Sequence, residues 1–251
     1  MKIAISDFDG TLKDFNMGVP RSNIEAIHKW RKAGNKFGIA TGRNVTMLDF
    51  ELQNYDITLD FLICVNGAVI FDKDRNILKS VKISPQIIKD FFEAPLIKDA
   101  DNPMTVFCER TVFTMRRPYP DIPSELVSEI SVDEAMRRDD VVQFGIKFAD
   151  ADAAKRAMEQ IESQFPMLGG NPNRQFLDIN MRGINKKTGI NQLLTLMNWN
   201  DNPLFVIGDD KNDLPMITHF KGYTVKTALP SIQAAASKVY NSVGNMLLDN
   251  L

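Results

Sequence analysis

IAISDFDGTL, residues 3–12, is the most informative stretch of this sequence. Its first four residues are apolar or small, which predicts a short buried strand. Two carboxylates, Asp7 and Asp9, follow that strand directly, and a Gly-Thr pair then turns the chain. Two like charges this close together repel each other beside a sheet core, where water cannot solvate them well. We therefore expect a cationic partner to face these two aspartates.

The bulk composition is that of an ordinary globular protein. The chain has 251 residues, of which 44% are hydrophobic and 25% charged, enough for one large domain or two modest ones. The formal net charge of −2 argues against a nucleic-acid partner, because such proteins usually carry a strong basic excess. No stretch approaches the roughly 18 apolar residues of a membrane span, so we expect no membrane partner either.

Cysteine usage and the first residues predict a cytoplasmic location. Cys64 and Cys108 lie far apart in apolar runs and form neither a CxxC motif nor a disulfide framework, which fits a reducing compartment. The chain also reaches Asp7 too soon for a signal peptide, so none is expected. The oligomeric state is not predicted by any feature of the sequence.

Strands and helices alternate in the first and last parts of the chain. Short apolar runs are separated by segments in which apolar residues recur at helical spacing. The runs lie at residues 3–5, 36–40, 61–65 and 204–207. Such alternation predicts an α/β fold with a Rossmann-like parallel sheet. Near the end of the chain, an alanine-rich helix is expected over residues 231–238.

The middle of the chain has a different pattern. Strand-like pieces occur there as close neighbours, as at 105–108 and 111–114, which indicates antiparallel hairpins. We therefore expect an α+β cap domain at residues 82–183, inserted into a split catalytic core that comprises residues 1–81 and 184–251.

Polar residues follow several of the predicted strands or open the helices beside them. In an open parallel sheet, ligands bind outside the carboxyl ends of the strands. The candidates at such positions are Asp7, Asp9, Thr41, Gly42, Lys186, Asp209, Asn212 and Asp213. They come from distant parts of the chain, so their convergence is a prediction from topology.

These residue types suit phosphoryl transfer. Asp7 and Asp209 are hard oxygen ligands of the kind that Mg²⁺ prefers, and Thr41 with N–H groups at a helix start suits phosphate oxygens. Lys186 adds a point charge for the same phosphate group. One carboxylate in line with phosphorus can attack it, while a second, two residues on, protonates the leaving oxygen and later deprotonates water.

Four motifs carry a resemblance to a known family. The motifs are DFDGTL (7–12), TGR (41–43), INKKTGI (184–190) and GDDKND (208–213). In this order they resemble the four motifs of the haloacid dehalogenase (HAD) superfamily of phosphatases. The insert between the second and third motifs is similar to the type IIB cap of the Cof-like subfamily. The resemblance implies a HAD-like core, Mg²⁺ as cofactor and a small-molecule phosphate ester as substrate.

The resemblance also implies the catalytic roles. Asp7 is the nucleophile that forms an aspartyl-phosphate, Asp9 is the general acid/base, and Lys186 stabilises the charge of the nucleophile and the phosphoryl group. We assign this role to Lys186 because the family pattern places the lysine before a small residue and threonine. Lys187 here occupies the small position, which glycine usually holds.

The ligand sets follow from the same resemblance. Metal is bound by Asp7, Asp9 through its backbone carbonyl, and Asp209; phosphate is bound by Thr41, Gly42, Lys186 and Asn212; Asp213 supports them. Arg43 is left open between a phosphate contact and a surface residue at a helix start. Arg116, Arg117 and a Pro-rich loop that follows them are either substrate contacts or part of a solvated face.

The sequence therefore predicts a Mg²⁺-dependent phosphatase that hydrolyses small phosphate monoesters through phospho-Asp7. Sugar phosphates and cofactor phosphates are the substrate classes that the resemblance suggests. Two alternatives stay open: a phosphomutase, which shares the core and a similar cap, and a non-catalytic phosphate-binding regulatory protein. Asp9 argues against the second, because a regulatory domain does not need a general acid at that position.

Overall fold

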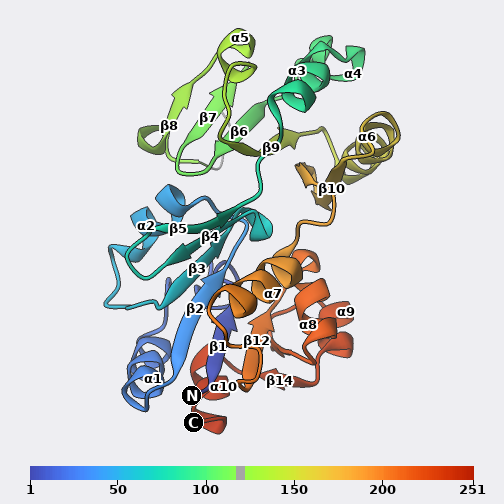
Figure 1. The fold of residues 1–251 in the computed structure, drawn as a ribbon. Helices are drawn as coiled ribbons and strands as arrows, with labels where there is room; N and C mark the ends of the chain where they lie inside the picture. Colours follow the sequence, from blue (N-terminus) through green and yellow to red (C-terminus); the bar gives the residue numbers. More distant parts are fainter. Residues whose placement is uncertain (117–121) are drawn as a thin grey trace. The chain divides into compact units, whose positions relative to one another are not determined.

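The computed structural model describes residues 1–116 and 122–251, which form two compact units (Figure 1). The first comprises Met1–Arg43, Leu48–Lys79 and Asn185–Leu251, and the second comprises Asn44–Met47 and Ser80–Ile184. The predicted insert, 82–183, falls inside the second unit, whereas the short segment at 44–47 was not expected there. Arg117 and, in the predicted Pro-rich loop that follows it, Pro118 and Pro120 lie outside the described residues.

The first unit is built on a mostly parallel sheet. Its strands are β1 (Ile3–Ser6), β2 (Lys36–Ala40), β3 (Phe61–Cys64), β4 (Val69–Asp72), β5 (Ile77–Ser80), β12 (Leu204–Gly208), β13 (Tyr223–Val225) and β14 (Lys238–Tyr240). The order among the described residues is β14-β13-β12-β1-β2-β3-β4-β5. Pairing is parallel from β14 to β3, and β4 is antiparallel to β3. This arrangement confirms the predicted α/β core.

Helices cover both faces of this sheet. They are α1 (Arg21–Lys32), α2 (Val45–Leu52), α7 (Lys186–Leu196), α8 (Leu214–His219), α9 (Pro230–Ala235) and α10 (Val243–Asp249). From β1 the chain steps through α1 to β2, but from β12 it steps through α8 in the other direction to β13. Because parallel crossovers of this kind are right-handed as a rule, α1 and α8 belong on opposite faces (Figure 1). All four residues of β1 are therefore buried between two layers.

Amphipathic spacing explains how α1 packs. Ala26, Ile27 and Trp30 are buried on its inner side, as expected for residues three and four apart. The indole Nε1 of Trp30 donates to the carbonyl of Lys36 at 2.9 Å, so the largest side chain of the helix has no unpaired polar atom. On the same side of the sheet, the N–H of Gly244 in α10 donates to Asn23 Oδ1 at 2.8 Å.

The C-terminal region differs from the sequence prediction. The helix expected over 231–238 ends at Ala235, and Lys238–Tyr240 forms strand β14 instead. Strand β14 pairs in parallel with β13, and Ser237 N donates to Gly222 O at 2.8 Å. The prediction was wrong here because it weighed alanine propensity alone. A β-branched and an aromatic residue, Val239 and Tyr240, follow the alanines and pair with an existing sheet edge.

The second unit is an α+β structure, as predicted. Its strands are β6 (Met104–Cys108), β7 (Val112–Met115), β8 (Val127–Glu129), β9 (Val141–Lys147), β10 (Leu168–Asn173) and β11 (Phe176–Met181), and its helices are α3 (Pro85–Glu93), α4 (Pro95–Lys98), α5 (Val132–Ala135) and α6 (Ala151–Gln164). The described strands form one sheet in the order β10-β11-β9-β6-β7-β8, in which only β7 and β8 are paired in parallel. The helices share a hydrophobic core with this sheet. In that core, Phe91 stacks on Phe144 with their ring centres 4.5 Å apart.

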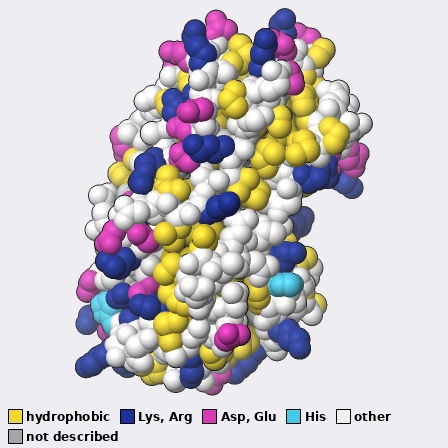
Figure 2. Space-filling view, in the orientation of Figure 1, with side chains coloured by type: hydrophobic (Ala, Val, Ile, Leu, Met, Phe, Trp, Pro, Cys, Tyr) yellow, Lys and Arg dark blue, Asp and Glu magenta, His cyan; other side chains and the backbone are white. Residues whose placement is uncertain are grey.

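The surface carries charges of both signs. On the face drawn in Figure 2, cationic and anionic side chains are interspersed. Within residues 1–116 and 122–251, no helix has the length and apolar character needed to cross a membrane.

Cys64 and Cys108 are buried free thiols. Burial raises the pKa of both, that of Cys108 to about 12, so neither is a ready nucleophile.

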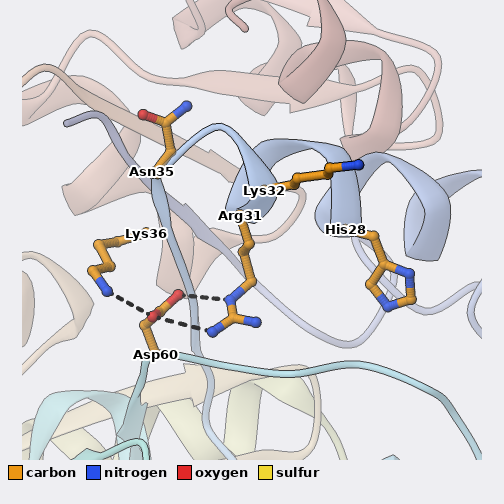
Figure 3. Close-up of a pocket in the computed structure, with 7 residues that line it drawn as sticks. His28, Arg31, Lys32, Asn35, Lys36 and Asp60 are labelled. Atoms are coloured by element: carbon orange, nitrogen blue, oxygen red, sulfur yellow. Dashed lines mark hydrogen bonds and ion pairs between the residues drawn. The ribbon is translucent and has the colours of Figure 1, made fainter.

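An ion-pair cluster at the amino ends of β2 and β3 ties α1 to the sheet (Figure 3). Asp60, whose side chain is 7% exposed, accepts from Arg31 Nε at 2.9 Å and from Lys36 Nζ at 3.0 Å. It also accepts from the backbone N–H of Phe37 at 3.1 Å. Burial alone would raise the pKa of Asp60, but these donors lower it below the usual value. Folding therefore favours the ionised carboxylate.

Replacing this carboxylate tests its contribution to stability. Asp60→Asn should lower the free energy of unfolding at pH 7 by about 1–3 kcal/mol, because two cations lose their charged partner. Since the folded-state pKa is lowered, the contribution is present above the unfolded value of about 3.9 and is lost as pH falls through the folded value. Urea denaturation of both proteins at neutral and at acidic pH measures this.

Asp56→Asn provides the matched control, because that carboxylate is 88% exposed in the loop before β3. It should change the free energy of unfolding by less than about 0.5 kcal/mol. An equal loss in the two variants would contradict the prediction. So would a difference between wild type and Asp60→Asn that does not shrink in acid.

Candidate active site

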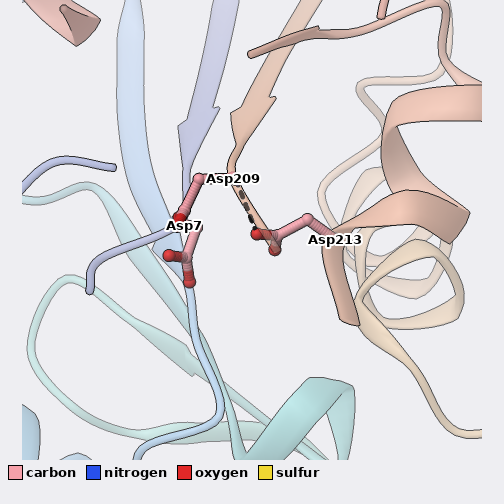
Figure 4. Close-up of side chains that lie close together, drawn as sticks. All are labelled: Asp7, Asp209 and Asp213. Carbon is pink, nitrogen blue, oxygen red and sulfur yellow. Dashed lines mark hydrogen bonds between the residues drawn. The ribbon is translucent and has the colours of Figure 1, made fainter. Parts of the chain in front are cut away.

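Three carboxylates meet at the carboxyl ends of β1 and β12. Asp7 directly follows β1, and Asp209 directly follows its parallel neighbour β12. Asp213 ends the short helix η3 (Lys211–Asp213) in the next turn of the chain. Each side chain has an oxygen within 4.8 Å of an oxygen of the other two, and Figure 4 shows them converging. The structure thus brings together acids that are some 200 residues apart in the chain.

Lys186 lies among these acids. Its Nζ donates to Asp7 Oδ1 and to Asp213 Oδ1, both at 2.5 Å, and its side chain is fully buried. It is the first residue of α7, whose N-cap Asn185 accepts from the N–H of Thr188. The neighbouring Lys187 is partly exposed. Lys186 is therefore the cation that the paired acids of the first motif led us to expect.

The cluster keeps an excess of negative charge. Burial raises the pKa of Asp7 well above its usual value; Lys186 opposes this shift, and the other two acids add to it. Burial also raises the pKa of Asp209 to about 6, against a hydrogen bond from Thr11. Burial alone would lower the pKa of Lys186, but Asp213 and Asp7 hold it above the ordinary value. A partly buried set of carboxylate oxygens with too little positive charge fits a hard divalent cation.

Asp213 shapes the loop that follows β12. Its Oδ2 accepts from the backbone N–H groups of Asp209 at 2.9 Å and Asp210 at 3.1 Å, while Oδ1 accepts from Lys186. Glycine is required at position 208, since a Cβ on Gly208 would lie 2.5 Å from Asp213 Cγ. Protein donors thus engage both oxygens of Asp213, which positions Asp209 at the edge of the sheet.

The turn after the first motif is also built around Asp209. Gly10 has φ +82, and a Cβ there would overlap the carboxylate of Asp209. Thr11 Oγ1 donates to Asp209 Oδ1. Both residues are therefore required by the site, beyond their turn-forming propensity.

The predicted phosphate ligands lie on neighbouring loops. Thr41, which is 1% exposed, follows β2 directly. A Cβ on Gly42 would lie 3.3 Å from Asn66 Oδ1, and Asn212 Nδ2 donates to the same oxygen at 3.2 Å. Asn66 therefore lies beside two of the predicted phosphate ligands.

From the sequence, the pair Asn66-Gly67 predicts a hairpin turn and no role in the site. Asn66 belongs to the short helix η1 (Val65–Gly67), in which all three residues have positive φ, with Asn66 at 54°. An Asn-Gly pair is a signal for positive φ, and that signal alone does not reveal a side chain aimed at a site. The missing information is the contact with Asn212, which is 146 residues away.

Asp9 is not part of the acidic cluster and pairs with Arg43. Arg43 Nε donates to Asp9 Oδ2 at 2.6 Å and Nη2 donates to Oδ1 at 2.8 Å. Nη1 lies 3.4 Å from Glu51 Oε1. Burial alone would lower the pKa of Arg43, but its bonds to Asp9 raise it. The structure adds a contact that the sequence did not suggest for Arg43, a two-point pair with Asp9.

Sequence comparison associates the chain with one family. A sequence profile described as haloacid dehalogenase-like hydrolase matches residues 4–245. The 5-amino-6-(5-phospho-D-ribitylamino)uracil phosphatase YcsE of Bacillus subtilis (strain 168) is 24% identical over 217 residues. That match covers 86% of this chain and 80% of the relative.

Solved structures share the fold over the full chain. A sugar phosphatase of HAD subclass IIB, BT4131, aligns with a TM-score of 0.82 at 22% identity and covers 100% of this chain and 97% of its own. BT1666 from Bacteroides thetaiotaomicron, described among phosphatases of the HAD enzyme superfamily, aligns with a TM-score of 0.81 at 25% identity, covering 100% and 93%. The fold seen here, insert included, is the fold of these proteins.

The buried ammonium makes a testable contribution to stability. Lys186→Met should lower the free energy of unfolding by about 3–5 kcal/mol, because it leaves buried carboxylates without their cation. Lys187→Met, one residue along the same helix, should change it by less than about 0.5 kcal/mol. Guanidinium denaturation without added metal measures both. Equal effects at the two positions would show that the acids do not depend on Lys186.

Proposed function

Since this chain belongs to the haloacid dehalogenase-like hydrolase family, we propose that it is a Mg²⁺-dependent phosphatase of small-molecule phosphate monoesters. The observation that carries the proposal is the meeting of Asp7, Asp209 and Asp213 around one buried lysine. A second carboxylate, Asp9, stands two residues from Asp7 in a separate environment. Two acids with different surroundings support two different chemical roles.

Metal binding belongs to the acidic cluster. Asp7, Asp209 and the backbone carbonyl of Asp9 would hold Mg²⁺, which when bound supplies positive charge to an incoming phosphate dianion. Lys186 favours the ionised, nucleophilic form of Asp7. The phosphate oxygens bind Lys186, Thr41, the amide of Gly42 and Asn212, while Asp213 keeps the loop of Asp209 in place.

Hydrolysis proceeds in two steps through an aspartyl-phosphate. In the first, a carboxylate oxygen of Asp7 attacks phosphorus, the ester P–O bond breaks, and Asp9 gives its proton to the leaving oxygen. In the second, Asp9 takes a proton from water, whose oxygen attacks phosphorus. The bond to Asp7 then breaks and inorganic phosphate is released.

The second unit acts as the cap that selects the leaving group and excludes water. Two relatives have a substrate in their printed names: a 5-amino-6-(5-phospho-D-ribitylamino)uracil phosphatase and a sugar phosphatase. These names support sugar phosphates as substrates, beside the cofactor phosphates that the sequence also suggests. The cytoplasmic location stays a prediction.

A substrate panel tests this function. With Mg²⁺, the wild type should release inorganic phosphate from p-nitrophenyl phosphate and from members of a panel of sugar and cofactor phosphates. Asp7→Asn should lower kcat/KM by roughly 10³-fold or more, because the nucleophile is lost. Asp201→Asn, an exposed carboxylate of the same unit, should leave kcat/KM unchanged.

The product distinguishes the alternatives. Inorganic phosphate supports hydrolysis, whereas an isomerised phosphate ester without phosphate release would make the enzyme a mutase. Phosphate binding without turnover of any panel member would make the protein a non-catalytic binder and overturn the proposal.

Metal binding has a readout that is independent of activity. Mg²⁺ should raise the thermal unfolding midpoint, since a ligand at ten times its Kd adds about 1.4 kcal/mol to stability. Asp209→Asn should remove most of this rise while leaving the metal-free protein at least as stable, because one of three mutually repelling acids becomes neutral. Asp201→Asn should keep the full rise. A rise that persists in Asp209→Asn would place the metal elsewhere.

A further inference from the structure

The contact between Arg43 and Asp9 has the geometry of an orienting pair. Two nitrogens of one planar guanidinium each donate to a different oxygen of one carboxylate, at 2.6 and 2.8 Å. A two-point contact of this kind sets the plane of the carboxylate as well as its position, which a lysine cannot do. The side chains are 23% and 31% exposed, so water only partly competes with the pair.

This pairing leaves part of each Asp9 oxygen unoccupied. An ionised carboxylate has about four lone-pair sites on its two oxygens, and Arg43 occupies one on each oxygen. The remaining sites can carry the proton or face the leaving oxygen. Arg43 therefore holds Asp9 without blocking the reaction assigned to it.

Arg43 is itself held from the opposite side. Its Nη1 lies 3.4 Å from Glu51 Oε1, and Glu51 Oε2 accepts from Lys13 Nζ at 2.6 Å. Lys13 lies in the turn that also contains Asp9, and its carbonyl accepts from Gly10 N at 2.9 Å. The chain Asp9–Arg43–Glu51–Lys13 thus returns to the loop on which it begins, entirely within the first unit.

An aromatic ring lies beneath this chain of charges. The guanidinium carbon of Arg43 is 5.6 Å and Lys13 Nζ is 5.8 Å from the ring centre of Phe8. Phe8 is fully buried, so it is a rigid support on which both cations rest. Three of the five N–H groups of Arg43 face acidic side chains in this arrangement.

We propose that Arg43 is the positioning residue of Asp9: it fixes the carboxylate in the orientation from which a proton reaches the leaving oxygen, and Glu51 holds Arg43 there. This inference rests on the proposed phosphatase function. Alignment of a reacting group is worth a large factor, since a misplacement of about 1 Å can cost 10²-fold in rate.

Leaving-group dependence tests this role. p-Nitrophenolate is weakly basic and departs without a proton, whereas the alkoxide of an alkyl ester such as glycerol phosphate needs one. Arg43→Ala should therefore lower kcat/KM roughly 10–100-fold on the alkyl ester and less than about threefold on the aryl ester. The comparison uses kcat/KM because this constant includes only the steps up to and including departure of the leaving group. Arg43→Lys, with a one-point contact, should lie between.

Two further variants connect the effect to Asp9 and Glu51. Asp9→Asn should show the same preference for the aryl ester in a stronger form, because it removes the proton donor itself. Glu51→Gln should show a weaker form, because Arg43 loses only its outer partner. Inhibition by inorganic phosphate should be unchanged within about twofold in Arg43→Ala, since no phosphate contact is lost.

Arg75→Ala is the matched control. Arg75 makes a two-point pair with Asp49, which lies on α2 like Glu51. Its Nε and Nη2 are 3.0 and 2.7 Å from Asp49 Oδ1. Its removal should not change the ratio of kcat/KM between the two esters. Thermal midpoints of all variants show whether each is folded, and Arg43→Lys keeps the test available if Arg43→Ala unfolds.

The inference is overturned if Arg43→Ala loses activity equally on both esters, if it loses none, or if inhibition by phosphate weakens. A wild type that hydrolyses neither these two esters nor any other panel member, or an Asp9→Asn without leaving-group preference, would instead overturn the proposed function on which the inference rests. The two failures are therefore distinguishable.

Discussion

The salt bridge of Lys186 with Asp7 and Asp213 is the contact on which the rest of the site depends. It joins the start of α7, the end of β1 and the turn after β12 through one fully buried ammonium. Charges removed from water at such cost persist only when their partners are close and well aligned. The loop that carries Asp209 therefore depends on Lys186, which lies directly after the insert, where the chain returns to the core.

This salt bridge also explains why two aspartates in one motif differ. Asp7 shares a buried ammonium with a second acid, whereas Asp9 is partly exposed and is held at both oxygens by Arg43. Phe8, which lies between them in the chain, is fully buried. The two carboxylates thus have different surroundings, which supports the separate roles proposed for them, although both follow the same strand and only one residue lies between them.

Much of the fold could be predicted from local patterns. Uninterrupted apolar runs, such as residues 61–64, belong to strands buried on both faces, and such runs are hard to mistake. The end of the chain was harder, because the alanines before Ser237 favour a helix while Val239 and Tyr240 favour a strand. The boundary between them was decided by the open edge of β13, which no local pattern contains.

The candidate site divides in the same way. Local sequence was enough to predict that the acids, the glycine turn and the lysine lie at one site, because these residue types suit phosphate and metal. It was not enough to find Asn66, Arg43 or Glu51 as neighbours of those groups. Their residue types are equally common on solvated surfaces, and only the distance to a partner distinguishes the two cases.

The chain alone specified which chemical groups are present and in what order along the β and α elements. The tertiary structure decided which charge faces which. The sequence predicted a cation facing the two aspartates of the first motif, and folding placed a different cation on each, Lys186 on Asp7 and Arg43 on Asp9. The physical reason is that electrostatic pairing depends on burial and on separations of a few ångströms. Such separations are set by how distant strands pair and helices pack, and sequence spacing does not contain them.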